Sequence, residues 1–297
     1  MIRTSVLALS LTACAPLVEP VATPFDLGVH DDLHALEEAS GGRLGVILLD
    51  DSGRELISFR ADQRFAFCSA FKLALAGAAL DRAATGQLDL DSPVTYSRGD
   101  FPGYQPALEA RLNGDTGQIS LRDALDATVT VSDNAAANLL IDALGGPAAV
   151  TAIWRGWGDT VSRLDRRETE LNENRPGDGR DTATPVALAD TARRLLTTDL
   201  LSPTDEARLE RLTNEASTGL NRVRGGLPET WRAGDKTGTC KNDGSPDPQA
   251  NDIGWFVTDT GQRYWFAVML GRYDGTNADA SAIHRDVGRL FAQAVSR

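Results

Sequence analysis

Histidine is scarce in this chain of 297 residues. The three histidines, His30, His34 and His284, lie near the ends of the chain, and none accompanies a pattern typical of a nucleophile. A catalytic serine needs a base to activate it. A serine in this protein would therefore depend on a lysine or a carboxylate, and a histidine-based triad is not expected.

Lysine is equally scarce, because only three of the 30 basic residues are lysines: Lys72, Lys236 and Lys241. Arginine stays protonated under all ordinary conditions, whereas lysine can lose its proton. A chain that otherwise uses arginine keeps lysine where a neutral amine or a compact ammonium is needed. The three lysines are therefore candidate functional positions.

Positive charge is in deficit overall, with a formal net charge of −12. An acidic surface repels phosphate, so nucleic acid is not expected as a partner. The 41% apolar and 24% charged residues are typical of a globular protein. The length allows one large domain or two interleaved ones.

Long apolar runs are absent after the N-terminus, so no membrane-spanning helix is predicted. At the N-terminus, Arg3 and a short apolar run over 6–11 indicate an export signal, and residues 1–23 are predicted to form the signal and a tether. Leu11 to Cys14 resembles a bacterial lipobox, which would make Cys14 a lipidated first residue and attach the protein to a membrane. Cleavage after Ala15 is the alternative. Both interpretations predict an exported, periplasmic protein.

Cysteine is limited to Cys14, Cys68 and Cys240. Without Cys14 an even pair remains, and an even pair in an oxidising compartment favours a disulfide.

Periodicity and turn residues predict a helix, two strands, a helical block, three strands and a final helix. The expected helices are 26–40, 69–85, 121–128, 132–144, 147–154, 185–196, 203–214 and 280–295, and the expected strands are 43–49, 55–59, 231–237, 253–258 and 264–270. The early and late strands would pair in one antiparallel sheet. Segments 24–62 and 215–297 would form an α/β lobe, and 63–214 a helical lobe.

The stretch 163–181 differs from its surroundings, because it is charged and shows no periodicity. A loop this long in a compact protein is usually functional. Within it, Glu168 precedes Asn172, and a carboxylate beside an amide can hold and activate a water. Solvated surface charge is the alternative.

Ser69 and Lys72 form a Ser-x-x-Lys pattern at the start of a predicted helix. Residues three apart share a helix face, with about 5–6 Å between Cβ atoms. The serine would lie near unpaired backbone N–H groups, and the lysine among Phe71, Leu73 and Leu75. Burial lowers the pKa of a lysine and makes its neutral amine a base. The pattern alone is weak, because it is short enough to arise by chance.

Two further patterns are ambiguous when taken singly. Ser132-Asp133-Asn134 offers a hydroxyl and an amide, but serine and aspartate are also common helix caps. The second pattern is Lys236-Thr237-Gly238-Thr239. It could bind a ligand carboxylate, because a glycine in a strand lets a ligand approach the backbone, but it also fits the end of a strand.

Together the motifs resemble one family. Ser-x-x-Lys, Ser-Asp-Asn and Lys-Thr-Gly in this order are typical of class A serine β-lactamases and penicillin-binding proteins. Glu168-x-x-Leu171-Asn172 resembles the loop of the β-lactamases only. The resemblance covers nearly the whole chain after Pro24. It implies an α/β (α+β) fold with a five-stranded antiparallel sheet flanked by helices, beside an all-helical lobe.

The resemblance implies a role for each motif in opening β-lactam antibiotics. Ser69 would be the nucleophile, and the backbone N–H groups of Ser69 and Thr239 the oxyanion hole. The acylation base is Lys72 or Glu168, which stays open. Ser132 would pass a proton to the leaving nitrogen, and Glu168 with Asn172 would position the deacylating water.

It also implies a substrate site. Lys236, Thr237 and Thr239, assisted by Arg222, would hold the substrate carboxylate. Asn134 would bind the side-chain amide, and Tyr104 would lie at the entrance. The implied partners are small β-lactams, with no cofactor or metal, and the implied state is a monomer.

Arg166 and Asp181 would close the long loop as an ion pair, by the same resemblance. Cys68 and Cys240 border the motifs, and a disulfide between them resembles that of the class A carbapenemases. One departure is Thr169, where many relatives have a cis proline. A penicillin-binding D,D-peptidase and a non-catalytic β-lactam sensor are the alternatives, and Glu168 and Asn172 argue against both.

Overall fold

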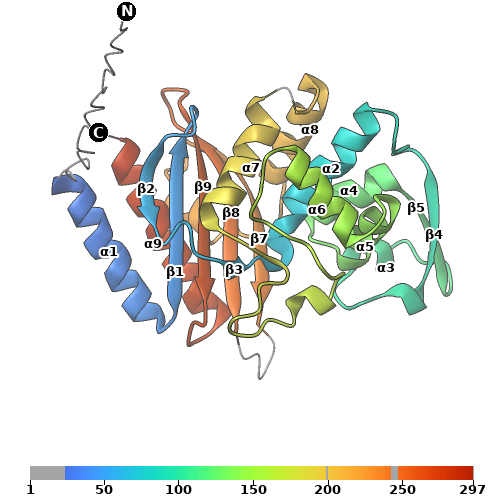
Figure 1. Cartoon of the computed structure of the whole chain (residues 1–297), viewed down its shortest axis with the longest axis horizontal. Helices are drawn as coiled ribbons and strands as arrows, with labels where there is room; N and C mark the ends of the chain where they lie inside the picture. Colours follow the sequence, from blue (N-terminus) through green and yellow to red (C-terminus); the bar gives the residue numbers. More distant parts are fainter. Residues whose placement is uncertain (1–23, 199, 242–246, 297) are drawn as a thin grey trace, which may run out of the picture.

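The computed structural model describes residues 24–198, 200–241 and 247–296 (Figure 1). The predicted export signal and Cys14 lie outside the described residues. Within these ranges no single helix is both long and apolar enough to cross a membrane, although one bent pair of helices, Asn134–Ala143 with Pro147–Gly156, has the required length and composition.

A five-stranded antiparallel sheet forms the centre of the molecule, in the order β2-β1-β9-β8-β7. Its strands are β1 (Arg43–Asp50), β2 (Glu55–Phe59), β7 (Arg232–Cys240), β8 (Gln249–Val257) and β9 (Arg263–Gly271). The predicted pairing of early with late strands is confirmed, because β1 lies between β2 and β9. This order makes β7, which carries Lys236 and Thr237, an edge strand.

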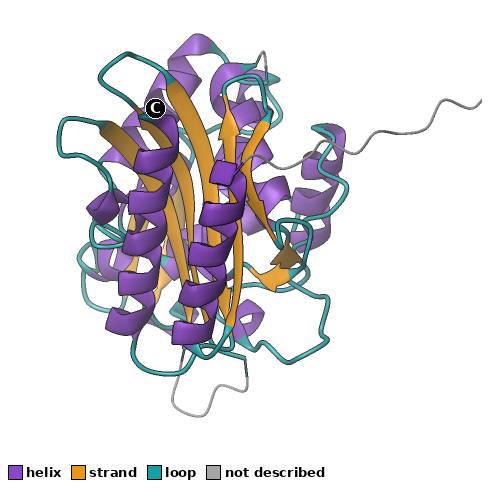
Figure 2. Cartoon of the chain, turned by 90° about the vertical axis from the view of Figure 1, so that its left-hand side faces the viewer, coloured by secondary structure: helices purple, strands orange, loops and turns teal. Residues whose placement is uncertain are grey.

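Helices cover both faces of the sheet. Helices α1 (Pro24–Ser40) and α9 (Asn277–Val295) lie side by side over one face (Figure 2). Their apolar side chains and that face form one hydrophobic core, which includes Leu33, Phe266 and Phe291. A larger core joins the opposite face to the remaining helices.

The helical side contains α2 (Lys72–Ala84), α4 (Leu121–Thr130), α5 (Asn134–Ala143), α6 (Pro147–Gly156), α7 (Pro185–Thr197) and α8 (Pro203–Asn214). Each was predicted, with ends that differ by a few residues. Helix α7 contacts the sheet, and α2 packs against most of the others. A short pair, β3 (Phe65–Ala66) and β6 (Thr182–Ala183), leads into α2 and closes the long loop.

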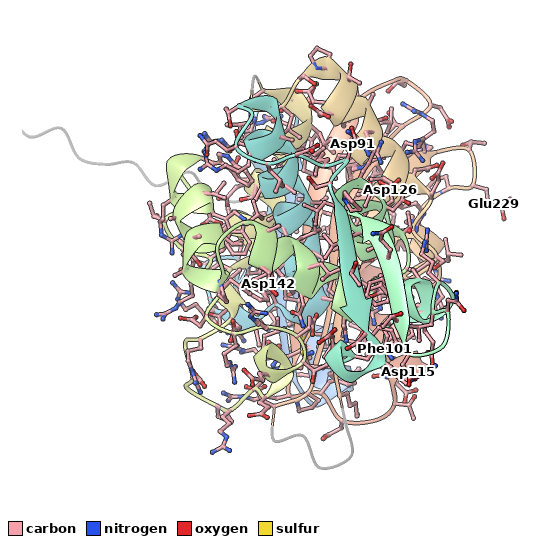
Figure 3. All side chains as sticks on the ribbon, turned by 90° about the vertical axis from the view of Figure 1, so that its right-hand side faces the viewer. Asp91, Phe101, Asp115, Asp126, Asp142 and Glu229 are labelled. Atoms are coloured by element: carbon pink, nitrogen blue, oxygen red, sulfur yellow. A yellow bond between two sulfur atoms is a disulfide. The ribbon has the colours of Figure 1, made fainter. Side chains whose placement is uncertain are left out.

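Sequence reasoning missed the antiparallel ribbon of β4 (Pro93–Ser97) and β5 (Thr116–Ser120), and the short helix α3 (Pro106–Glu109) between them. Each ribbon strand buries a single residue, Tyr96 and Ile119, so neither shows a clear alternation. Figure 3 displays the ribbon from its exposed side, with Asp91 and Asp115 at opposite ends.

Candidate active site

Ser69 lies one turn before the main helix. A 3₁₀ helix, Cys68–Phe71, carries it, and α2 begins at Lys72. The predicted helix over 69–85 is therefore a 3₁₀ turn followed by an α-helix. This arrangement leaves Ser69 part-exposed and buries Lys72 completely.

The Lys72 amine is held by three groups. Its Nζ lies 3.0 Å from Glu168 Oε1, and it donates hydrogen bonds to Asn134 Oδ1 at 2.6 Å and to the Ser132 carbonyl at 2.9 Å. Burial lowers the pKa of Lys72, and the charge of Glu168 opposes this shift. The site therefore holds an amine that can give up or take a proton.

The Glu168 carboxylate contacts several of the candidate site residues. Its Oε1 accepts a hydrogen bond from Ser69 Oγ at 3.3 Å, and its Oε2 accepts one from Asn172 Nδ2 at 2.7 Å. The side chain is fully buried, and the bond between Glu168 and Thr169 is cis. One carboxylate thus contacts the hydroxyl, the amine and the amide that the sequence singled out separately.

Strand β7 forms the facing wall. The Lys236 amine is fully buried and donates hydrogen bonds to Ser132 Oγ at 3.1 Å and to the Thr237 carbonyl at 2.9 Å. Burial, assisted by the charge of Lys72, lowers the pKa of Lys236 to about 7. Ser132 Oγ also lies 3.5 Å from Lys72 Nζ, so this hydroxyl lies between the two amines.

Gly238 explains how close β7 comes to Ser69. A Cβ at this position would lie 2.3 Å from the Phe67 carbonyl oxygen and 3.2 Å from the Ser69 nitrogen. Any other residue would push β7 away. The glycine therefore brings the backbone around Thr239 beside that of Ser69, as an oxyanion hole requires.

Arg222 forms hydrogen bonds to strands β7 and β8. It donates hydrogen bonds to Thr239 Oγ1 at 2.7 Å and to the Asn251 carbonyl at 2.6 Å. Burial lowers the pKa of the Arg222 guanidinium. The arginine thus orients the hydroxyl of Thr239, while Thr237 Oγ1 donates to the Thr218 hydroxyl at 2.9 Å.

Tyr104 and Asn134 lie at the edge of the site. The Tyr104 side chain is among the most exposed large apolar groups in the described chain, and its carbonyl accepts a hydrogen bond from the Asn134 N–H at 2.9 Å. Asp133 caps α5, as the alternative interpretation expected, through a bond from Ala136 N–H to its side chain. The cap fixes the turn that presents Ser132 and Asn134.

Comparisons with known proteins point to one family. A model of the Beta-lactamase enzyme family matches residues 28–295. The chain is 39% identical over 261 residues to Beta-lactamase FAR-1 of Nocardia farcinica, covering 88% of this chain and 81% of that one. It is 42% identical over 211 residues to Beta-lactamase Toho-1 of Escherichia coli, covering 71% and 72%. An ancestral (GNCA) class A β-lactamase structure superimposes with a TM-score of 0.84 at 43% identity, over 90% of this chain and 99% of that one.

The chain belongs to the class A β-lactamases. The resemblance found in the motifs is thus confirmed, as are the enzyme class and the predicted fold.

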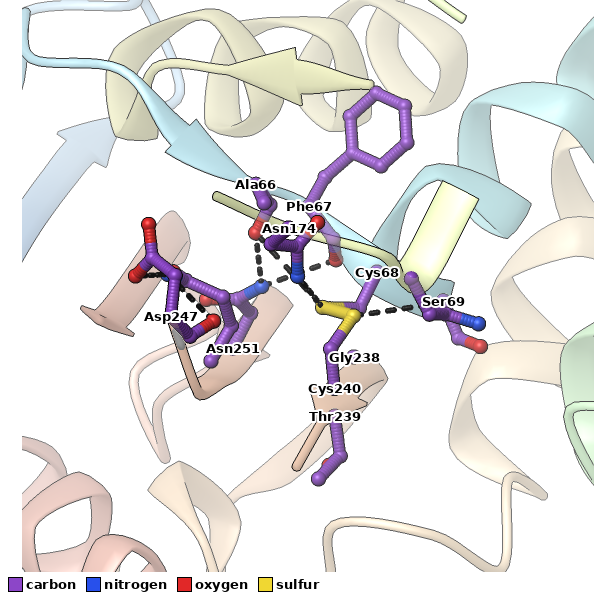
Figure 4. The surroundings of a disulfide bond; sticks show 12 residues. Ala66, Phe67, Cys68, Ser69, Asn174, Gly238, Thr239, Cys240, Asp247 and Asn251 are labelled. Atoms are coloured by element: carbon purple, nitrogen blue, oxygen red, sulfur yellow. Dashed lines mark hydrogen bonds between the residues drawn. A yellow bond between two sulfur atoms is a disulfide. The ribbon is translucent and has the colours of Figure 1, made fainter. Parts of the chain in front are cut away.

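The β-lactamase carries the disulfide between Cys68 and Cys240, with Cα atoms 5.8 Å apart. Figure 4 displays it between Ser69 on one side and Asn174 on the other, with Thr239 below Cys240. The Cys240 sulfur also contacts Asn172 Oδ1 at 2.8 Å. The disulfide therefore joins the 3₁₀ helix that carries Ser69 to the end of β7, and it matches the disulfide of the carbapenemase-like subset.

The two ends of the long loop of the β-lactamase, residues 163–181, are held together by an ion pair and hydrogen bonds. Arg166 Nε lies 2.6 Å from Asp181 Oδ2, and the backbone N–H groups of Asp165 and Arg166 donate to Asp181 Oδ1. Because Asp181 is fully buried, this pair fixes the two ends of the segment that presents Glu168.

Asn138 is a residue that sequence reasoning missed. Its Nδ2 donates to the Glu168 carbonyl at 2.8 Å, and its Oδ1 accepts from the Glu168 N–H at 3.0 Å. It lies one turn after Asn134, on the same face of α5. That spacing was the only available signal, because its partner is 30 residues away.

Proposed function

We propose that this β-lactamase opens penicillins, cephalosporins and carbapenems through an ester on Ser69, which a water activated by Glu168 then hydrolyses. The observation that carries the proposal is the position of Glu168, whose carboxylate meets the Ser69 hydroxyl, the Lys72 amine and the Asn172 amide. A penicillin-binding relative needs no such carboxylate, because it keeps its ester.

Acylation begins when Ser69 Oγ attacks the lactam carbonyl carbon. Its proton passes to Glu168, whose Oε1 accepts the serine hydrogen bond at 3.3 Å. The proton then moves to Lys72 and through Ser132 Oγ to the lactam nitrogen, as the C–N bond breaks. A neutral Lys72 that takes the serine proton itself is the alternative, and its lowered pKa supports that route.

Deacylation uses the same carboxylate, free again after the first half-reaction. Glu168 and the Asn172 amide, 2.7 Å apart, hold a water against the ester carbonyl. Glu168 takes a proton from the water while the water oxygen forms a bond to the carbonyl carbon of the ester. The intermediate then collapses, and Ser69 leaves with a proton returned from Glu168.

Strand β7 binds the substrate in this proposal. Lys236, Thr237 and Thr239 hold the substrate carboxylate, and Arg222 orients Thr239 through the 2.7 Å hydrogen bond. The backbone N–H groups of Ser69 and Thr239 receive the oxyanion. Asn134 binds the side-chain amide, and Tyr104 covers the entrance.

Carbapenem turnover rests on the disulfide. The bond between Cys68 and Cys240 fixes the residue before the nucleophile to the end of β7. It also places a sulfur against Asn172, which helps to hold the water. We infer that this cross-link keeps the water site ordered while a carbapenem ester occupies the cleft.

The enzyme acts outside the cytoplasm as a monomer, according to this proposal. The export pattern of residues 1–23 and the lipobox-like Leu11 to Cys14 support export and attachment through Cys14. Segments 24–62 and 215–297 make up one lobe, and 63–214 the other, with Ser69 at their junction.

Hydrolysis of a chromogenic cephalosporin in large excess tests the proposal. Sustained release of the chromophore, many equivalents per enzyme, is expected. A single burst of about one equivalent would instead identify a penicillin-binding peptidase or a sensor. No product at all would contradict the assignment of Ser69.

A further inference from the structure

A cavity lies behind the loop that carries Glu168, away from Ser69. It has a volume of about 420 Å³, within the range of small-molecule sites. Its walls come from the loop (Arg166, Asn174, Arg175), from the start of β1 (Arg43) and from the ends of β8 and β9 (Gln249, Arg272). Asn174 separates it from the disulfide, since its Nδ2 lies 3.8 Å from Cys68 Sγ (Figure 4).

The cavity is strongly cationic in an acidic protein. Six arginines line it: Arg43, Arg64, Arg166, Arg175, Arg180 and Arg272. Only two aspartates, Asp178 and Asp247, accompany them, so the lining has a formal charge of +4 in a chain of −12. The local potential is therefore opposite in sign to that of the whole molecule.

Half of these arginines lack a carboxylate partner in the described part of the chain. Arg43 donates to Gln63 Oε1 and the Arg64 carbonyl, and Arg64 donates to Thr182 Oγ1 and the Val161 carbonyl. Arg175 forms no ion pair within those residues. These contacts leave three arginines around the cavity without an ion pair among the described residues.

The other three arginines of the cavity form ion pairs of unequal closeness. Arg166 and Arg180 pair closely with Asp181 and Asp178, at 2.6 and 2.7 Å. Arg272 lies 3.7 Å from Asp247, a loose pair with an arginine that is half exposed. Burial lowers the pKa of Arg43, and the charge of Arg272 lowers it further. An anion between Arg43 and Arg272 would relieve this repulsion.

The wall also contains polar atoms without partners. Among the described residues, four buried atoms in the lining have no hydrogen-bond partner: Arg43 Nε, Arg166 Nη2, Asn174 Oδ1 and Gln249 Oε1. Two are donors and two are acceptors. Buried polar groups are nearly always paired, with protein, water or ligand. The residues that line the cavity therefore contain hydrogen-bonding capacity, for both donors and acceptors, that the described part of the protein leaves unused.

We propose that this cavity binds phosphate, as the hydrogen phosphate ion, between the back of the loop and the ends of β1, β8 and β9. Hydrogen phosphate carries two negative charges for the arginines and a P–OH that can donate to an amide oxygen. Bound there, it links Arg175 on the loop to Arg43 and Arg272 on the sheet. It therefore holds in place the segment that presents Glu168.

Calorimetric titration of the intact enzyme with inorganic phosphate, at constant ionic strength, tests the proposal. We expect saturable binding to the wild type and an affinity at least tenfold weaker in R175Q/R272Q, since each arginine forms a charge-assisted hydrogen bond. The control R54Q/R289Q removes the same charge and breaks two surface ion pairs outside the cavity, and it should bind like the wild type.

Two further arms locate the ion. Phosphate could also occupy the substrate carboxylate site, so T237A/T239A should keep full phosphate affinity. Loss of binding in T237A/T239A with retention in R175Q/R272Q would overturn the proposal, as would an equal loss in R54Q/R289Q. Sulfate has no proton to donate and should bind more weakly, and equal affinity would contradict the use of the amide oxygens.

Amide hydrogen exchange tests the effect on the loop. Phosphate should slow exchange over residues 174–181 in the wild type and leave R175Q/R272Q unchanged, because ordering reduces local opening. Unchanged exchange in phosphate-saturated wild type would refute the link between the ion and the loop.

Discussion

Replacement of Glu168 by glutamine is the sharpest perturbation of the site. The amide keeps the shape of the carboxyl group, and its oxygen can still accept the hydrogen bond from Asn172 Nδ2. It cannot take a proton from water. A positioned general base contributes about 10²–10⁴-fold to a rate, so deacylation should slow by this factor in E168Q.

Acylation should continue in E168Q for an electrostatic reason. Lys72 is fully buried and lies 3.0 Å from the carboxylate that raises its pKa. Without that charge, burial lowers the pKa of Lys72 further, and its neutral amine can accept the Ser69 proton. Breaking a buried ion pair can cost about 3–5 kcal/mol. The loss should be smaller here, because Lys72 can become neutral.

The assay is mass spectrometry of the intact protein after mixing with benzylpenicillin, together with steady-state hydrolysis of a chromogenic cephalosporin. We expect E168Q to carry one covalent penicillin that persists, and to turn over at least a hundredfold more slowly. The matched control is E170Q, the same change at an exposed position of the same loop, which should behave like the wild type. Wild-type turnover by E168Q would refute water activation by Glu168, and the absence of an adduct would contradict acylation through a neutral Lys72.

Four other changes test separate parts of the structure. N138A removes both hydrogen bonds to the Glu168 backbone and should lower kcat about tenfold or more with a smaller change in KM; an unchanged kcat would argue against this support. C68S/C240S should lower the free energy of unfolding by at most about 5 kcal/mol for a sequence separation of 172, and should reduce carbapenem kcat more than cephalosporin kcat; equal ratios would separate the disulfide from carbapenem turnover. Because the pKa of Lys236 is about 7, its amine is charged below that pH and neutral above it, so the cephalosporin KM should rise as the pH increases beyond 7 and stay flat in K236R; a KM independent of pH in the wild type would contradict the carboxylate role. R166A leaves Asp181 buried without its partner and should destabilise the protein by about 3–5 kcal/mol in denaturant titration, whereas wild-type stability would mean that the pair is unimportant.

Local pattern determined most of the secondary structure. The alternation and turn residues around Asp51 to Gly53 predicted the β1–β2 hairpin, and the apolar run after Ser69 predicted α2. Both signals are local, because each is contained in the residues of a single helix or hairpin. Over such short distances, neighbouring side chains determine the backbone conformation. The β4–β5 ribbon was not predicted, because each of its strands buries only one side chain.

The sequence by itself also determined which residues could carry the chemistry, because Ser69 and Lys72 lie within one turn and the other motifs follow in a fixed order. Only the tertiary structure decided how they meet. The Glu168 carboxylate reaches Ser69 across 99 positions, Asn138 holds Glu168 from α5, and six arginines from four segments surround one cavity. Packing of distant segments creates these contacts and the burial that lowers the pKa of Lys72 and Lys236. No short-range pattern encodes them, since the partners become neighbours only when the chain is folded.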